Sequence, residues 1–366
     1  MAPGFETEPN TAPVSTTANP HARGVNNAHR VENIVAAQHL SRGALLASGL
    51  PPLVPAVYAW APYRPEIEGE GGLGWMLDEF RTGEELIGVF PRLPLDEKRK
   101  LVTELAQTFS CIQAVKLPLD VKKFGGLTFD EHGRIVDGQM PTLDGGPWET
   151  YAEVWQARLR AQLKNSEKEG LVLLGWRPDG VRDRIEAFLA NGGVERVLDS
   201  VDVKQRVLVH GDFTSWNVLF ESESARITAL LDFDFASVTH PCHEFFGGFS
   251  DIGGGIRFED KGCQFLAQPV LSGNFGQVPE GLSEEQLDKW EVAKAWDAAL
   301  ATRGAIRPSS IAGLDRLEDL RVMADMICPR MLSHEMMLKR APRDVQEKQR
   351  QEIQVKLLRL LEKYGF

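Results

Sequence analysis

The sequence of 366 residues lacks the marks of several protein classes. Its four cysteines form no C-x-x-C pair, which excludes a zinc knuckle or a dithiol redox motif and indicates free thiols in a reducing compartment. They are Cys111, Cys242, Cys263 and Cys328. No stretch approaches the about 18 consecutive apolar residues of a membrane span, and the N-terminus has neither a basic start nor an apolar run. We therefore expect a cytoplasmic protein without a membrane partner.

The chain also lacks an excess of positive charge. Lysine and arginine number 41 against 52 aspartates and glutamates, which gives a formal net charge of −11. Because this balance repels phosphate backbones, we expect no nucleic-acid partner, and the oligomeric state is left open. Hydrophobic residues make up 43% of the chain, which is enough for a folded core and excludes disorder throughout.

The N-terminal quarter divides into a tail and a small structured region. Residues 1–28 are rich in Pro, Thr, Asn and Ala and have almost no large apolar side chains, so we predict a disordered tail that is too polar to form strands. Residues 29–80 follow, with apolar residues at helical spacing over 30–48. Residues 54–60 and 75–80 are aromatic and β-branched, which favours two paired strands. Residues 81–366 are predicted to be mainly helical.

The most informative stretch surrounds two short apolar strands, 207–209 and 227–231. The first delivers Asp212 to a strand end and the second ends at Asp232, while Asn217 follows Asp212 by five residues. If the two strands pair as a hairpin, these three side chains meet. Mg²⁺ prefers oxygen ligands, and one or two carboxylates with an amide suffice when a nucleotide phosphate completes the shell. A further carboxylate could accept the proton of an attacking hydroxyl.

His210 stands two residues before Asp212. Because the adjacent carboxylate already suits proton transfer, we interpret His210 as a structural histidine that forms hydrogen bonds near the loop.

Two motifs in this stretch carry a family resemblance. His210–Asn217 reads H-G-D-x-x-x-x-N and Leu230–Asp234 reads L-L-D-F-D. In this order they resemble the aminoglycoside phosphotransferase and choline kinase family, whose fold is similar to that of protein kinases. The resemblance implies an α+β, bilobal fold. It would have a reduced, β-containing N-terminal lobe and hinge strand at 29–80, and a large, mainly helical C-terminal lobe at 81–366.

The resemblance also implies an activity and a site. The activity would be Mg²⁺-dependent transfer of the γ-phosphate of ATP or GTP to a small-molecule hydroxyl. Asp212 would be the catalytic base, Asn217 and Asp232 the Mg²⁺ ligands, and Asp234 would assist the metal site. The backbone around Asp78, Glu79 and Phe80 would contact the nucleotide base. The resemblance further suggests that the segment containing Glu244 borders the substrate cleft.

One part of the family pattern is missing. A kinase of this shape holds the phosphates with a glycine-rich turn and a strand lysine, but the first lysine of this chain is Lys98. Three explanations stay open: Arg23, Arg30 or Arg42 supplies the charge, Mg²⁺ alone holds the phosphates, or transfer has been lost. The alternatives to a kinase are therefore a pseudokinase that binds a ligand or partner, and an enzyme that uses the same cleft for chemistry other than phosphoryl transfer.

Overall fold

The computed structural model describes most of the chain and divides it into two compact units. The described residues are 13–17, 25–64, 66, 72–168, 172–256 and 263–366. The first unit consists of Met1–Glu149 and Gln205–Ile311, and the second of Thr150–Lys204 and Ala312–Phe366. The predicted lobe boundary at residue 80 falls inside the first unit and stays a prediction.

A small antiparallel sheet begins the first unit. Its strands are β1 (Pro13–Thr17), β3 (Trp75–Glu79) and β2 (Val57–Ala61), in the order β1-β3-β2. Strand β1 corrects the prediction that the polar tail forms no strand. Valine and threonine suit an extended edge strand, and Pro13 stands first in it, where proline is tolerated. Residues 25–28 of the predicted tail are ordered as well, because Asn26 caps a short 3-10 helix, Asn27–His29, and its N–H donates to the Pro141 carbonyl oxygen at 2.6 Å. The other residues of the predicted tail lie outside the described residues.

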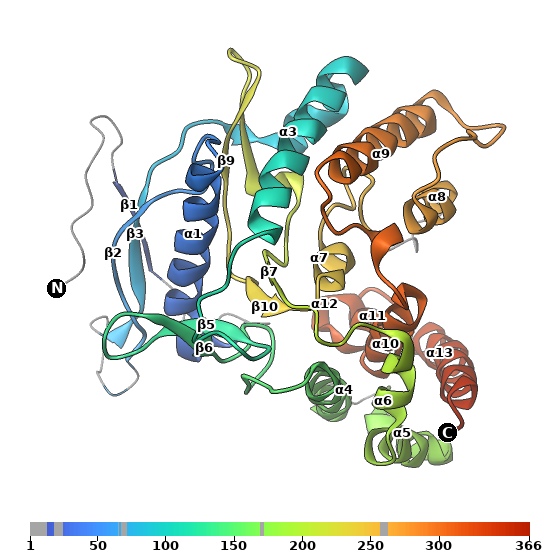
Figure 1. Ribbon diagram of the computed structural model, residues 1–366. Helices are drawn as coiled ribbons and strands as arrows, with labels where there is room; N and C mark the ends of the chain where they lie inside the picture. The colour runs from blue at the N-terminus through green and yellow to red at the C-terminus, as the bar shows by residue number, and fades with distance from the viewer. Residues whose placement is uncertain (1–12, 18–24, 65, 67–71, 169–171, 257–262) are drawn as a thin grey trace. The chain divides into compact units, whose positions relative to one another are not determined.

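Helix α1 (Arg30–Ala47) lies beside this sheet, and the hairpin of β5 (Gly126–Phe129) and β6 (Ile135–Gly138) lies across the helix (Figure 1). The buried Asn33 side chain joins the two elements because its Oδ1 accepts the Leu127 N–H at 2.7 Å. The rings of Trp60 and Phe129 stack with centroids 5.0 Å apart. A hairpin from later in the sequence therefore packs against the small N-terminal region.

The two strands of the motif region pair differently from the prediction. Strand β7 (Val207–Val209) pairs with β10 (Ser237–Thr239), and β9 (Arg226–Leu230) pairs with β8 (Val218–Glu221). The predicted hairpin between 207–209 and 227–231 is thus wrong. Only a short turn separates β8 from β9, so closing this local hairpin costs less chain entropy than a longer loop would. Strand β4 (Glu84–Glu85) extends the sheet along β8.

Helices cover the rest of the first unit. The long helices α3 (Leu95–Gln113) and α9 (Glu284–Thr302) pack against each other (Figure 1). Phe109 of α3 contacts Phe249 and Trp296 in an aromatic core. Helix α9 begins with a capping box, in which Ser283 Oγ accepts the Gln286 N–H at 3.3 Å. The shorter helices are α2 (Leu86–Val89), α7 (Cys242–Gly247) and α8 (Ala267–Ser272).

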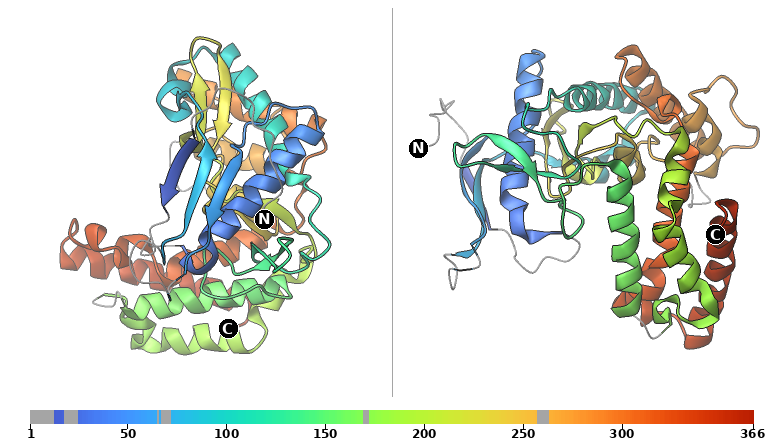
Figure 2. Two further views of the ribbon diagram at one scale, coloured as in Figure 1. Left: turned by 90° about the vertical axis from the view of Figure 1, so that its left-hand side faces the viewer. Right: turned by 60° about the horizontal axis from the view of Figure 1, so that its bottom comes forward.

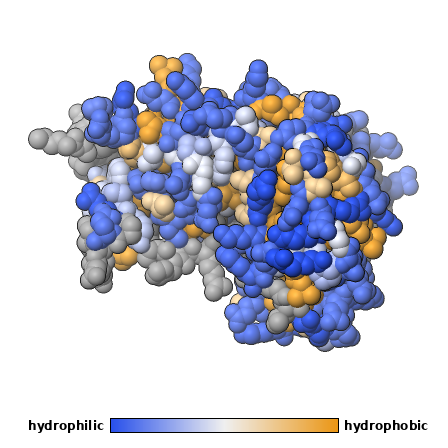
Figure 3. Space-filling model, turned by 90° about the horizontal axis from the view of Figure 1, so that it is seen from below, coloured by the Kyte–Doolittle hydropathy of each residue, from blue (hydrophilic) through white to orange (hydrophobic). Residues whose placement is uncertain are grey.

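The second unit is helical over its described residues, and its longer helices run side by side (Figure 2). The long helices are α4 (Tyr151–Lys168), α5 (Val181–Ala190), α10 (Leu314–Ile327) and α13 (Arg343–Lys363), and the short ones are α6 (Gly193–Val197), α11 (Arg330–Ser333) and α12 (Glu335–Leu338). Trp155 and Trp176 are fully buried, and the Trp176 indole donates to the Ile327 carbonyl at 2.7 Å. Among the described residues no helix is long and apolar enough to cross a membrane. The face shown in Figure 3 is mostly hydrophilic, with its apolar residues in small groups.

Candidate active site

The sharp turn after β7 depends on Gly211, which no other residue can easily replace. Gly211 has φ +85°, and a Cβ atom there would lie 2.6 Å from the Phe235 carbonyl oxygen. Any side chain would therefore meet both backbone strain and a steric clash. The close approach allows the chain to turn sharply between His210 and Asp212.

His210 is completely buried and ties this loop to the end of β9. Its Nδ1 accepts the Asp212 N–H at 3.3 Å, and its Nε2 lies 2.9 Å from the Leu231 carbonyl oxygen. The acceptor role of Nδ1 places the ring proton on Nε2. Burial lowers the pKa of His210 to about 4, so the ring is neutral near pH 7. These contacts agree with the structural role that the sequence favours.

Glu244 binds the backbone of the same loop. Its carboxylate accepts the N–H groups of His210 at 2.7 Å and Gly211 at 3.0 Å. The side chain is buried, and this burial raises the pKa of Glu244 to about 7. The polar atoms of Glu244 thus face the loop backbone, and the expectation that its segment borders the substrate cleft stays a prediction.

Asp212 and Asn217 form one hydrogen-bonded group. Asn217 Nδ2 donates to the Asp212 carbonyl oxygen at 2.8 Å and to the Asp212 carboxylate at 2.9 Å. The Asn217 carbonyl oxygen accepts the Leu231 N–H at 2.8 Å, which fixes the asparagine next to the strand that leads to Asp232. Among the described residues, none donates to Asn217 Oδ1. The amide thus orients the carboxylate with one end and leaves an oxygen donor at the other.

Asp232 brings a second carboxylate to this group. It has φ +60°, a left-handed conformation that aspartate tolerates better than most residues. Burial raises the pKa of Asp232 most, and the negative charges of Asp234 and Asp212 raise it further. Burial likewise raises the pKa of Asp212. Asp212 and Asp232 are thus close enough to repel each other, and a cation between them would relieve this repulsion.

This donor set fits Mg²⁺ when further oxygen ligands are supplied. Two carboxylates and an amide oxygen are hard donors of the kind that Mg²⁺ prefers. Within the described part of the chain, no group of three His, Cys, Asp or Glu side chains could hold a metal by itself. The protein contribution is therefore partial, as expected for an ion that keeps waters and binds substrate phosphates.

Asp234 is engaged differently from Asp232. Arg30 Nε donates to Asp234 Oδ1 at 2.9 Å, and Arg30 Nη2 donates to Oδ2 in a two-pronged ion pair. The carboxylate thus directs both oxygens at a guanidinium. This geometry gives no support to the metal-assisting role predicted for Asp234.

A cavity of about 470 Å³ connects the metal-ligand candidates with the predicted hinge. Asp232 and Asp234 line one part of it, and Asp78, Glu79 and Phe80 line another. The other lining residues are Arg30, Val31, Ile34, Gln38, Pro55, Met76, Arg81, Leu219, Leu231 and Phe233. Its volume is in the range of small-ligand sites. The structure therefore brings all predicted nucleotide and metal residues except Asn217 to the wall of one cavity.

The acidic residues of the hinge differ in their surroundings. Glu79 Oε2 accepts hydrogen bonds from Arg42 at 3.1 Å, from Arg81 at 2.9 Å and from the Ala56 N–H at 3.0 Å. Asp78 Oδ1 is buried without a hydrogen-bond partner among the described residues, and burial raises the pKa of Asp78 to about 6. Glu79 is thus a fixed structural carboxylate, whereas Asp78 presents an unsatisfied acceptor to the cavity.

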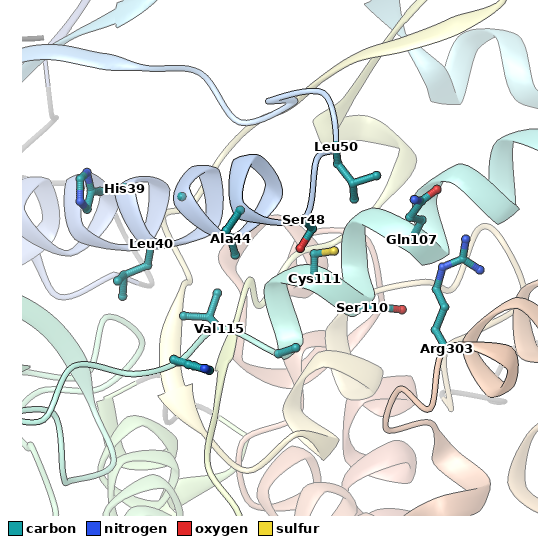
Figure 4. A pocket seen from close by; sticks show the side chains of 14 residues that line it. His39, Leu40, Ala44, Ser48, Leu50, Gln107, Ser110, Cys111, Val115 and Arg303 are labelled. Carbon is teal, nitrogen blue, oxygen red and sulfur yellow. The ribbon is translucent and has the colours of Figure 1, made fainter.

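A larger cavity of about 730 Å³ lies between α1 and α3 (Figure 4). His39 and Ala44 of α1 and Cys111 of α3 line it, and Arg303 lies at its edge. It shares no lining residue with the cavity at the motifs and has no aspartate or glutamate in its wall. The oxygen donors described above therefore single out the smaller cavity as the candidate active site.

Comparison with known proteins places the chain in a family. Residues 19–267 match the model of the phosphotransferase enzyme family, abbreviated APH. Since this match covers more than half of the sequence, the chain belongs to that family. The predicted family resemblance and the predicted α+β, kinase-like fold class are thereby confirmed. No curated protein sequence matches the chain.

Solved structures of aminoglycoside phosphotransferases are distantly similar. A candidate aminoglycoside phosphotransferase from Ralstonia eutropha JMP134 is 14% identical with a TM-score of 0.47, over 98% of this chain and 88% of that one. APH(2'')-Ib with ADP bound is 14% identical with a TM-score of 0.42, over 90% and 84%. The enzyme from Alicyclobacillus acidocaldarius is 14% identical with a TM-score of 0.38, over 96% and 87%.

Sequence reasoning did not find the roles by which two residues shape the site. Glu244 holds the loop backbone, and Asn33 of α1 holds the chain after Asp234 through a 2.8 Å hydrogen bond from Nδ2 to the Ala236 carbonyl oxygen. Both side chains are polar, and both are buried next to large apolar residues of their helices. A polar residue in such surroundings is the signal that could have identified them, because burying it requires a specific partner.

Proposed function

We propose that the protein transfers the γ-phosphate of ATP or GTP to the hydroxyl of a small molecule in an Mg²⁺-dependent reaction. The observation that carries this proposal is the grouping of Asp212, Asn217 and Asp232 beside the cavity that the hinge also lines. Family membership supports phosphoryl transfer as the class of chemistry. The nucleotide, the metal and the acceptor are part of the proposal.

Each residue of the group has a role in this reaction. The Asp212 carboxylate orients the acceptor hydroxyl and takes its proton as the oxygen attacks phosphorus. Asn217 Nδ2 holds this carboxylate in one orientation. His210 and Glu244 fix the loop backbone on which Asp212 stands, and neither exchanges a proton with the substrate because both are buried.

Two oxygen donors would hold the metal. Asn217 Oδ1 and an Asp232 carboxylate oxygen are the ligands that the chain offers, with the nucleotide phosphates and water as the others. Mg²⁺ supplies neutralisation of the charge that develops on the phosphate oxygens. At the other part of the cavity, the backbone around Asp78, Glu79 and Phe80 would receive the nucleotide base.

A second candidate function is nucleotide binding without transfer. It is favoured by the composition of the cavity wall, which has four carboxylates and two arginines but no lysine among the described lining residues. Loss of a cation aimed at the phosphates typically costs orders of magnitude in rate. An enzyme using Asp212 for other acid–base chemistry shares this loop geometry but would not need a nucleotide.

The decisive experiment measures ADP formation from Mg-ATP, with and without an aminoglycoside or an amino alcohol as acceptor. The same assay also detects transfer of the phosphate to water when no suitable acceptor is present. We expect Asp212→Asn to lower turnover by about 10²- to 10⁴-fold while ATP affinity changes little, because the residue acts on the acceptor. Wild-type protein that binds ATP but forms no ADP would favour the second candidate, and protein that binds no nucleotide would exclude both.

A further inference from the structure

The cavity lacks the lysine that kinases of this shape direct at the nucleotide phosphates, so another cation must be sought. Among the described lining residues the fixed positive charges are Arg30 and Arg81. Arg42 lies nearby because it contacts Glu79, which also lines the cavity. Arg23, the other arginine that the sequence offered, lies outside the described residues.

Arg42 and Arg81 are committed to the hinge. Arg42 Nη1 donates to the Val54 carbonyl oxygen at 2.7 Å, and Arg81 Nη2 donates to the Pro52 carbonyl oxygen at 2.7 Å. Both also contact Glu79. These contacts hold the two guanidinium groups around one hinge carboxylate, in the part of the cavity assigned to the base.

Arg30 occupies the part of the cavity that holds the metal-ligand candidates. It is the first residue of α1, and its side chain is 17% exposed. Its ion pair with Asp234 and the charge of Asp232 both raise the pKa of Arg30, so the guanidinium lies within electrostatic reach of Asp232. The phosphates of a nucleotide bound to the metal would also lie in this part of the cavity, close to the Arg30 guanidinium.

The position of Arg30 is fixed by two contacts from α1. The Arg30 guanidinium donates to the Asp234 carboxylate, and Asn33, one helical turn later, donates to the Ala236 carbonyl oxygen at 2.8 Å. The start of α1 is thus attached to residues 234–236 by both side chains. Such attachment pre-organises the cation before a ligand binds, which reduces the entropy lost on binding.

We propose that Arg30 is the phosphate-binding cation of this protein and that Asp234 is its positioning residue. The proposal rests on the nucleotide site proposed above and replaces a strand lysine by an arginine at the start of a helix. A planar guanidinium has several donors and binds carboxylates and phosphates with two parallel hydrogen bonds. A phosphate at this end of the cavity would therefore meet an arginine whose orientation is set by the Asp234 carboxylate.

The test compares the affinities of ATP, ADP and adenosine by calorimetry in the presence of Mg²⁺, using the full chain. We expect Arg30→Gln to weaken ATP and ADP binding by about tenfold or more, which corresponds to a lost charge-assisted hydrogen bond, and to leave adenosine binding within about twofold. Arg30→Lys should restore part of the ATP affinity because it keeps the charge but not the planar fork. Asp234→Asn should weaken ATP more than adenosine.

Arg81→Gln is the matched variant, since it removes the same charge from the same cavity near the hinge. We expect it to change the affinities of ATP and adenosine by the same factor. Two results would overturn the proposal for Arg30 and leave the proposed function intact. One is equal ATP affinity of the wild type and Arg30→Gln, and the other is an equal loss of affinity for ATP and adenosine in Arg30→Gln. Wild-type protein that binds none of these three ligands, and none of GTP, GDP and guanosine in the same titration, would overturn the nucleotide site and this proposal together.

Discussion

The buried pair of His210 and Glu244 should give the protein an unusual dependence of stability on pH. His210 has a pKa of about 4 in the folded protein against an ordinary value of 6.5. Glu244 has a pKa of about 7 in the folded protein against an ordinary value of 4.5. Both groups avoid charge because both are buried, but a neutral histidine has lost a proton and a neutral glutamate has gained one.

The two groups therefore change stability in opposite directions. Between pH 6.5 and 4 the unfolded chain binds a proton at His210 that the folded protein excludes, so the free energy of unfolding falls as pH falls. Between pH 4.5 and 7 the folded protein keeps a proton on Glu244 that the unfolded chain releases, so the free energy of unfolding falls as pH rises. At about 1.4 kcal/mol for each pH unit, each effect amounts to about 3 kcal/mol, and they largely cancel between pH 4.5 and 6.5.

Single substitutions should reveal separately how His210 and Glu244 change the free energy of unfolding with pH. We expect the free energy of unfolding of His210→Gln to fall as pH rises from 4.5 to 7, more steeply than that of the wild type. The reason is that the opposite effect of His210 no longer compensates for the deprotonation of Glu244 in the unfolded chain. Glu244→Gln should instead gain about 3 kcal/mol of stability between pH 4 and 6.5. Urea denaturation at a series of pH values measures both curves, and the trend with pH matters more than the absolute stability of either variant.

His132→Gln provides the matched control, because His132 is an exposed histidine at the β5–β6 turn. Its curve should run parallel to that of the wild type. Curves for His210→Gln and Glu244→Gln that also run parallel to the wild type would refute the reasoning, since they would mean that neither buried group differs in pKa between the folded and unfolded protein.

Two further predictions concern the elements that position the site. Gly211→Ala should destabilise the protein by about 2 kcal/mol or more, because its Cβ atom would clash with the Phe235 carbonyl oxygen. Gly133→Ala also has a positive φ but meets nothing within 4 Å, so denaturation should show a smaller loss, and equal losses would refute the steric argument. Asn33→Ala should cost about 2–5 kcal/mol by leaving the Leu127 N–H and the Ala236 carbonyl oxygen unsatisfied. A loss below about 0.5 kcal/mol would show that water replaces both contacts.

The sequence predicted the elements of the site better than their pairing. Residues 207–209 form a strand as expected, and the helix predicted over 30–48 ends one residue earlier at Ala47. Strand pairing was wrong because the sequence pattern did not reveal β8, which forms the local hairpin with β9. Hydrophobic periodicity reports which residues are extended, whereas partner choice depends on turn geometry and tertiary contacts.

The chemistry of the site was predictable only where a motif has fixed spacing. Asp212 and Asn217 stand five residues apart on one turn, so their contact follows from local geometry. The ion pair of Arg30 with Asp234 joins residues 204 positions apart, and no local pattern encodes it. Strand β1 was also missed because its polar side chains contribute little to a hydrophobic pattern, although its backbone pairs with β3.

The central claim is that Asp212, Asn217 and Asp232 form a metal-dependent nucleotide site. Calorimetric titration of the full chain with ATP, in Mg²⁺ and then in EDTA, tests it most directly, with Asp232→Asn as the variant. We predict that the wild type binds ATP at least tenfold more tightly with Mg²⁺ than without it, and that Asp232→Asn loses most of this difference because a ligand oxygen is replaced by an amide. ATP affinity that is independent of Mg²⁺, or a metal effect of full size in Asp232→Asn, would contradict the account.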